Sequence, residues 1–334
     1  MVKSENNDSK VLTASCFALA VIASCFVLHV TRDVFVPLVL ALFLFYSINP
    51  LPKFFSRKFN LSMSISILIS FFIIAGIVSL LILGSFISIN SFLNDISLYQ
   101  SKLQVFVEKI ITLLNENGIV FDKNELKENL LQLPIFNISK TMASFASGFL
   151  GNVLLVFLLL VFIFLSSGAK GKVNNPLERI GESISLYTDT KIAVSLLTAF
   201  LSWIVMVSIG LDLSLMLAIL TFLLNFIPSI GSVIAILLTL PIALLQFGLG
   251  TYFIILVILL PFIQFFVGNV IEPKIMGSGL GVHPITVLIS LILWGLIWGI
   301  PGMFLSVPIT VAIKIVCEEF KYTKGMAKVI EGDF

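Results

Sequence analysis

The sequence predicts an all-α polytopic membrane protein. Hydrophobic residues make up 58% of the chain and charged residues 11%, whereas an ordinary globular domain carries about 25% charged residues. Several apolar runs approach or exceed the ~20 residues that a membrane-spanning helix needs. Proline and glycine breaks interrupt the last of these runs. We expect six full spans and two broken, re-entrant helical hairpins, or alternatively eight transmembrane helices, with a small amphipathic helical insert outside the cytoplasm.

Residues 1–90 are expected to form three transmembrane spans. Apolar segments at 11–31 and 34–49 meet at Arg32 and Asp33, a pattern that predicts a helical hairpin, and the third span covers 62–90. The loop after the second segment contains basic residues and no acidic one, namely Lys53, Arg57 and Lys58. Such loops lie in the cytoplasm by the positive-inside rule, which places the N-terminus there as well.

The insert is expected at residues 91–144, where charged residues alternate with apolar ones at helical spacing. It is interpreted either as a ligand-receiving cap or oligomer contact, or as a solvated helical spacer. Residues 145–191 then supply the fourth span, at 145–166, and a cytoplasmic linker that contains several lysines and an arginine.

Residues 192–316 are expected to form the transport core, and 317–334 a cytoplasmic tail. The segment from Asp212 to Gln246 would measure about 50 Å as one helix, too long for a hydrocarbon core near 30 Å. Within the core, the order of one span followed by one broken segment occurs twice, at 192–250 and 251–316. Inverted repeats of this kind are typical of transporters. Prolines and glycines are assigned to shaping the hairpins: Pro228, Gly231, Pro241, Pro273, Gly277, Pro301, Gly302 and Pro308.

Glu272 is the only acidic residue between Phe262 and Cys317. A carboxylate at membrane depth must pair or face water, because an unpaired charge there costs about 2.5–3.5 kcal/mol on insertion scales. Glu272 is therefore interpreted as a proton- or cation-coupling group on the transport path. The alternative is an interfacial residue paired with Lys274.

Three amides complete the candidate path for a substrate or ion: Asn225, Gln264 and Asn269. They can hydrogen-bond a polyhydroxylated solute or supply oxygen ligands to Na⁺, and the alternative is hydrogen bonding that holds helices together. We find no motif for a metal site, a phosphate-binding loop or a catalytic nucleophile. The sequence thus predicts neither an enzyme nor a cofactor, and a net charge of +2 gives no indication of a nucleic-acid partner.

Three stretches carry a family resemblance: NFIPSIG, GNVIEPKIMGSGLGVHP and WGLIWGIPGMFLSVPITVAIK. They resemble the signature regions of the AI-2E transporter family, and the specific match covers Tyr187 to Lys314. The resemblance implies a homo-oligomeric permease of the bacterial inner membrane, without ATP hydrolysis. It further implies export of the quorum-sensing signal autoinducer-2 or a similar small polar molecule. A Na⁺(Li⁺)/H⁺ antiporter is the alternative within the family, and a non-transporting membrane scaffold is a third possibility. Both termini are expected in the cytoplasm.

Overall fold

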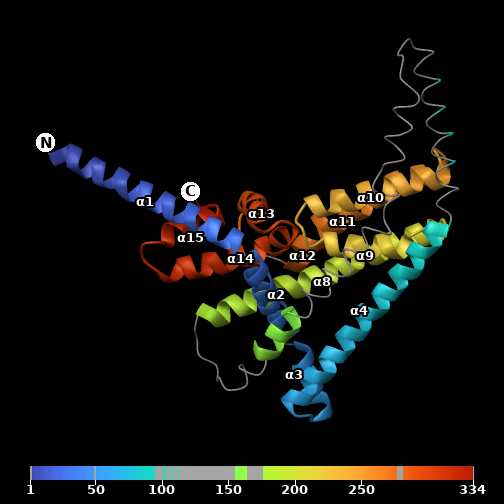
Figure 1. Cartoon of the computed structure of the whole chain (residues 1–334), viewed down its shortest axis with the longest axis horizontal. Helices are drawn as coiled ribbons and strands as arrows, with labels where there is room; N and C mark the ends of the chain where they lie inside the picture. The colour runs from blue at the N-terminus through green and yellow to red at the C-terminus, as the bar shows by residue number, and fades with distance from the viewer. Residues whose placement is uncertain are drawn as a thin grey trace. The chain divides into compact units, whose positions relative to one another are not determined.

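The computed structural model describes residues 2–48, 50–94, 101, 105, 108, 112, 155–163, 176–276 and 281–333. Within these residues the regular secondary structure is helical and no strand occurs, which confirms the all-α prediction (Figure 1). The helices are α1 (Val2–Val30), α2 (Arg32–Ile48), α3 (Pro50–Phe59), α4 (Met63–Asn94), α8 (Pro176–Ser208), α9 (Ser214–Leu224), α10 (Ile230–Phe247), α11 (Thr251–Phe266), the π-helix η2 (Val267–Ile271), α12 (Glu272–Met276), α13 (Pro284–Trp298), α14 (Ile300–Glu319) and α15 (Lys324–Glu331). Residues 155–163 are also helical.

Four helices in the described part of the chain are long and apolar enough to cross a membrane. They cover Arg179–Ser208, Ile230–Phe247, Thr251–Met276 and Ile300–Glu319, and the bent pair α1–α2 would make a fifth. Shorter apolar helices occur at Met63–Ile74, Ser214–Leu224 and Pro284–Trp298. These features agree with a multi-pass membrane protein. The division into six spans and two hairpins stays a prediction.

The predicted insert at 91–144 lies mostly outside the described residues, as does Gly277. Of the predicted fourth span at 145–166, the structure describes 155–163.

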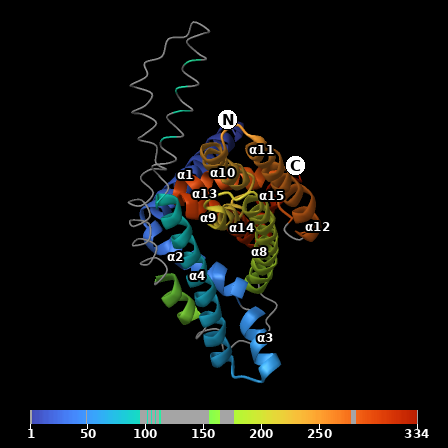
Figure 2. The ribbon, with the colours of Figure 1, turned by 90° about the vertical axis from the view of Figure 1, so that its right-hand side faces the viewer.

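The chain packs as two compact units. One contains Met1–Ser47, Leu154–Ser185 and Leu280–Phe334, and the other contains Ile48–Val153 and Leu186–Gly279. In the second unit α3 packs on α4, α4 on α9, and α10 on both α9 and α11. In both ribbon views α9 lies next to one end of α4 (Figures 1 and 2). In the first unit α13 packs along α14, which also contacts α15.

The N-terminal helices do not form the predicted hairpin. The axes of residues Leu19–Val30 and Arg32–Tyr46 differ by 88°, so α1 and α2 are almost perpendicular. Thr31 is the only residue between them. Its backbone N–H donates to the carbonyl oxygen of Val27, and its carbonyl oxygen accepts from the N–H of Phe35. Its hydroxyl also donates to the carbonyl of Val27, a contact that bends helices. A single connecting residue leaves no room for a full reversal of the chain.

The first overlong segment is broken where the sequence predicts. Helix α9 ends at Leu224 and α10 begins at Ile230, with Pro228 in the turn between them. Gly231 packs so closely on α9 that a Cβ atom there would overlap the carbonyl oxygen of Leu224. Ser229 adopts a φ of 59°, a conformation in which the chain changes direction sharply.

The second overlong segment is also broken at its predicted position. Gly299, with φ of 68°, separates α13 from α14. A Cβ atom at Gly302 would overlap the carbonyl oxygen of Trp294 in the last turn of α13. Both breaks therefore use a positive-φ residue followed by a glycine that lies against the preceding helix. The other assigned prolines lie inside helices or in their first turns: Pro241 in α10, Pro273 in α12, Pro301 and Pro308 in α14.

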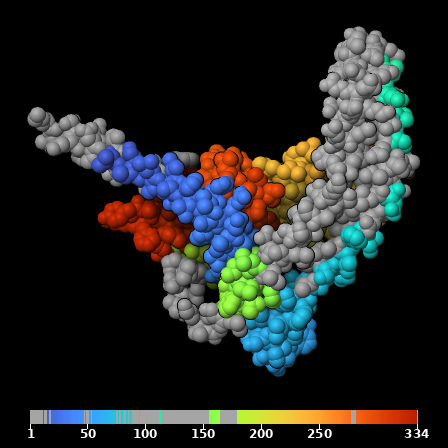
Figure 3. Space-filling view, viewed as in Figure 1, coloured from blue at the N-terminus to red at the C-terminus, as the bar shows by residue number. Residues whose placement is uncertain are grey.

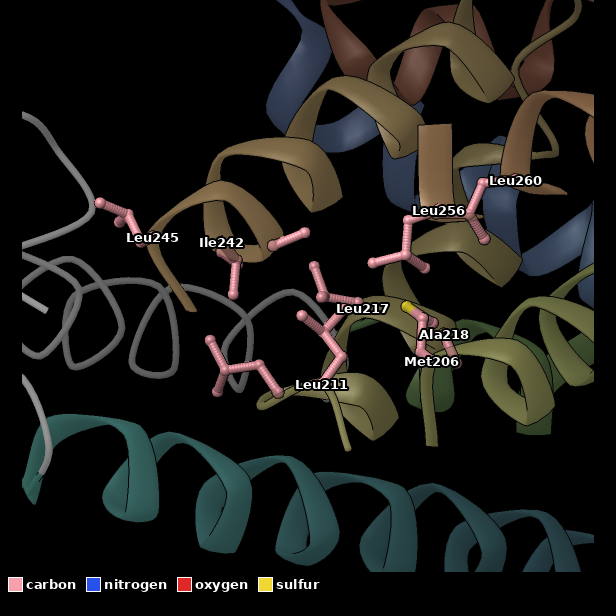
Figure 4. Packing of buried hydrophobic residues seen from close by; sticks show 10 residues of the cluster. Met206, Leu211, Leu217, Ala218, Ile242, Leu245, Leu256 and Leu260 are labelled. Carbon is pink, nitrogen blue, oxygen red and sulfur yellow. The ribbon is translucent and has the colours of Figure 1, made fainter. Parts of the chain in front are cut away.

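A hydrophobic core joins α8 to α11 within the second unit. Met206 of α8, Leu217 of α9 and Leu256 of α11 are almost fully buried. Figure 4 shows their side chains gathered between the helices. The same cluster contains Leu211, Leu213, Ala218, Ile242, Ala243, Leu245 and Leu260. This core thus contains side chains from α8, α9, α10 and α11.

Candidate functional site

Glu272 forms an ion pair with Lys191. The Nζ atom of Lys191 lies 2.5 Å from Oε1 of Glu272, and the two side chains are 6% and 18% exposed. Lys274, the partner considered from the sequence, is exposed on α12 instead. The Lys274 pairing is therefore wrong. The structural reason is that α8 brings a lysine from 81 positions earlier in the chain to the carboxylate.

Lys191 also contacts the first helix break. Its Nζ donates to the backbone carbonyl oxygen of Asn225 at 3.3 Å. The side-chain amide of Asn225 donates in turn to Oγ of Ser195 at 3.0 Å. One buried network thus connects α8, the turn between α9 and α10, and the start of α12. Removing one partner of a buried ion pair is strongly destabilising, because the other charge is left uncompensated.

Five buried side chains on α8 carry polar groups at helical spacing. Tyr187, Lys191, Ser195, Thr198 and Ser202 follow one another at intervals of four, four, three and four residues, so they lie on one face of the helix. Such a face normally turns toward the protein interior only when it is apolar. We refer to this face as the polar stripe of α8.

Two observations relate α8 to α11 and the helices that continue it. Met206 packs in one cluster with Leu256 and Leu260, whereas Lys191 pairs with Glu272. Lys191 and Met206 are separated by about 22 Å of helix, and Leu256 and Glu272 by a similar length. The two segments therefore run in opposite directions, and Gln264 lies midway along the second one, eight residues from both Leu256 and Glu272.

Three buried oxygen atoms of this region have no hydrogen-bond partner within the protein. They are Oη of Tyr187, Oγ of Ser202 and Oε1 of Gln264. Tyr187 also interacts electrostatically with Glu272. An unsatisfied buried polar group costs about 1–3 kcal/mol, so each of these atoms favours a hydrogen-bonding guest. Among the described residues, the unsatisfied side-chain atoms all lie on α8 and α11.

A π-helix precedes Glu272. The buried face of α11 runs through Leu256, Leu260 and Gln264 at intervals of four, and Glu272 lies eight positions after Gln264. In a regular α-helix, the residue eight positions after Gln264 would be rotated by about 80° around the helix axis relative to Gln264. The wider turn of η2 reduces that rotation. The π-helix therefore keeps Glu272 directed at Lys191. Single π-turns within α-helices are frequent at functional sites.

The structure brings some predicted path residues together and leaves one apart. Glu272 and Asn225 join the Lys191 network, and Gln264 is buried on α11. Asn269 is exposed, and its amide donates to the carbonyl oxygen of Phe265 in its own helix at 3.0 Å. Asn269 therefore does not contact this network.

Sequence reasoning missed Lys191, Ser195 and Tyr187. The basic residues before Lys191 predict a cytoplasmic linker that ends at this residue, whereas its side chain is buried on α8. The available signal was the spacing of polar residues along 187–202, since they recur on one face of a segment that is otherwise mostly apolar.

His283 and two tryptophans have structural roles in the other unit. The backbone N–H of His283 donates to Ile330, and its ring accepts from the N–H of Ile285 at the start of α13. The rings of Trp294 and Trp298 pack with centroids 4.9 Å apart. Trp298 also donates to the carbonyl oxygen of Leu28. No group of residues in the described ranges has the composition of a metal site.

Comparison with known proteins gives one consistent result. A model described as "AI-2E family transporter" matches residues 16–321. The chain is 29% identical to the AI-2 transport protein TqsA of Escherichia coli strain K12 over 300 residues, which are 86% of each chain. It is 30% identical to YhhT of the same strain, described as a candidate transport protein, over 90% of this chain and 88% of YhhT. A candidate transport protein of Borreliella burgdorferi is 27% identical over 91% of this chain and 86% of its own length. These names are those of transport proteins and not of enzymes.

Proposed function

Because the chain belongs to the AI-2E family of transporters, we propose that it is a secondary permease of the bacterial inner membrane that exports autoinducer-2 or a similar small polar molecule. The observation that carries the proposal is the polar stripe of α8, with the Lys191–Glu272 pair at one end and the unpartnered oxygens of Ser202 and Gln264 further along. A helix that served packing alone would bury apolar side chains on that face.

The unpartnered atoms favour a solute that carries hydroxyl groups. Oε1 of Gln264 is an acceptor, and the hydroxyl of Ser202 both donates and accepts. A hydroxyl group of the solute can donate a hydrogen bond to Oε1 of Gln264, and it can either donate to or accept from the hydroxyl of Ser202. A site that hydrogen-bonds a hydroxyl discriminates strongly against analogues that lack it, since its own polar groups are then left unpaired. The proposed substrate path contains Asn225, Gln264 and Glu272, with Asn269 at its exposed margin.

Movement is proposed to occur at the helix breaks. Lys191 holds both Glu272 and the carbonyl of Asn225, which adjoins the turn before α10. Release of that carbonyl would free the turn to reorient, and broken helices near the midplane are the usual location of such changes in transporters. We further propose that the repeats at 192–250 and 251–316 are inverted, that both termini are cytoplasmic, and that the protein functions as a homo-oligomer, as the family resemblance implies.

The ion pair also favours the second candidate function, a Na⁺(Li⁺)/H⁺ antiporter. A proton or Na⁺ that binds Glu272 would compete with the ammonium group of Lys191 for the carboxylate. Binding would then weaken the contact between Lys191 and α12, which links occupancy by a cation to the conformation of the network. Cation binding and the conformational change of the network are coupled in this way if the cation binds the two conformations with different affinities.

Transport by the purified protein in lipid vesicles separates the two functions. Vesicles loaded with autoinducer-2 should release it faster than protein-free vesicles, and Gln264→Leu should slow that release more than Asn269→Leu does. If release matches that of protein-free vesicles while an imposed Na⁺ gradient acidifies or alkalinises the lumen, the antiporter is correct. If neither solute moves, the scaffold is favoured.

A further inference from the structure

We propose that residues 320–329 bind the surface of a membrane that contains anionic lipids. This segment follows α14, one of the helices long and apolar enough to span a bilayer, which ends at Glu319. The backbone becomes extended at Phe320, and α15 begins at Lys324. A short helix that starts within a few residues of the end of a span lies close to the headgroup region. In the space-filling view α15, coloured red, is exposed at the surface of its unit (Figure 3).

One side of α15 is fixed to the protein. Ala327 is buried, and the carbonyl oxygen of Ile330 accepts hydrogen bonds from the backbone of His283 and from the hydroxyl of Thr286. The carboxylate of Glu331 lies 2.6 Å from the ammonium group of Lys314, which is buried. These contacts set the rotation of α15 about its axis and determine which face is turned outward.

The outward face combines apolar and basic side chains. Phe320, Tyr322, Met326 and Val329 are 61%, 100%, 48% and 53% exposed. Lys321, Lys324 and Lys328 are exposed among them. Basic residues that flank exposed apolar and aromatic ones are typical of helices that lie in the membrane interface.

Nearby carboxylates do not neutralise these lysines. Glu318 and Glu319 are bonded to the guanidinium of Arg179 at 2.6 Å and 3.0 Å, and Glu331 is bonded to Lys314. Three carboxylates thus share two cationic partners, Arg179 and Lys314, so this group retains one negative charge, and the exposed Asp333 adds a second. The three lysines outnumber these two charges and leave a net positive surface, to which anionic phosphate headgroups are complementary.

A fluorescent probe on the outward face tests the proposal. Cys16, Cys25 and Cys317 are the cysteines of the chain. They would be replaced, and Met326→Cys would carry an environment-sensitive dye in the full-length protein in nanodiscs. We expect blue-shifted emission in phosphatidylcholine mixed with phosphatidylglycerol, and emission close to that in water in phosphatidylcholine alone. Added salt should reverse the shift, because ions screen surface charge.

The decisive variant combines Lys321→Gln, Lys324→Gln and Lys328→Gln. Each lysine near an anionic surface strengthens binding about fivefold, so this variant should weaken the bound state on the order of 100-fold. Arg57→Gln, Lys58→Gln and Lys274→Gln remove the same charge from other exposed positions and should leave the emission unchanged. Equal emission in both lipid mixtures, or a shift that survives the triple Lys→Gln change, would overturn the proposal and indicate that protein, such as a second copy of the chain, covers this face.

Discussion

Lys191 is the residue on which the buried network depends. Its ammonium group contacts a carboxylate from α12 and a backbone carbonyl from the turn after α9. Its side chain is 6% exposed, and an uncompensated charge at such a site has no access to bulk water. The pair with Glu272 therefore fixes how α8 and α12 meet.

Lys191→Met should destabilise the protein by about 3–5 kcal/mol, because it leaves the Glu272 carboxylate without its partner. Lys191→Met combined with Glu272→Gln removes both charges and should be less destabilising than the sum of the single changes. Thermal unfolding of the purified variants in detergent measures this non-additivity. Strictly additive shifts in unfolding temperature would show that the two side chains do not interact.

At the residue scale the sequence identified one half of this pair. Glu272 is recognisable because a lone carboxylate in an apolar stretch must have a compensating group. The sequence offers Lys274 as a partner only in the alternative interpretation, by proximity along the chain. The true partner depends on the register between α8 and α11, which is set by tertiary packing and cannot be obtained from local spacing.

The two helix breaks are the elements that give the core its layout. Proline and glycine in NFIPSIG and GIPG predicted both breaks, because the segments are too long for one crossing and these residues interrupt helices. The N-terminal hairpin was predicted by the same reasoning from Arg32 and Asp33, and it was wrong. The chain bends by 88° at Thr31, the single residue between α1 and α2, and does not reverse its direction.

Gly231→Ala should disrupt the first break, since the new methyl group would overlap the carbonyl oxygen of Leu224. Gly302→Ala should do the same at the second break, against Trp294. We expect a lower yield of folded protein and a lower unfolding temperature for both. Gly76→Ala in α4, which would meet nothing within 4 Å, is the matched control. Normal unfolding temperatures for the first two variants would mean that the helix packing at the breaks is looser than described.

At the scale of the whole molecule, composition and hydropathy sufficed to predict a multi-pass helical protein. The order of span and broken segment, which occurs twice in the chain, suggested the internal repeat. The crossing count does not follow from length alone. Ser214–Leu224 and Pro284–Trp298 are shorter than a full span, so each is compatible with half a hairpin or with a tilted, incomplete crossing.

Cysteine labelling of Ile275→Cys distinguishes the two topologies. Ile275 is exposed on α12. It belongs to the connection from Glu272 to His283, which is expected in the cytoplasm in the hairpin arrangement and outside in the eight-helix arrangement. In a background without the three native cysteines, we predict that a membrane-impermeant reagent labels it from the cytoplasmic side. Labelling from the outside alone would favour eight transmembrane helices.

The most direct measurement of the proposed mechanism compares coupled transport with exchange in vesicles that contain the Lys191→Met, Glu272→Gln double variant. This variant keeps the approximate size of both side chains and removes both charges. Exchange of autoinducer-2 between the two sides should persist, because the atoms of Ser202 and Gln264 are unchanged. We predict that the dependence of net transport on an imposed pH or Na⁺ gradient is lost. If the double variant responds to these gradients as the wild-type protein does, the Lys191–Glu272 pair is structural and does not couple transport to a cation.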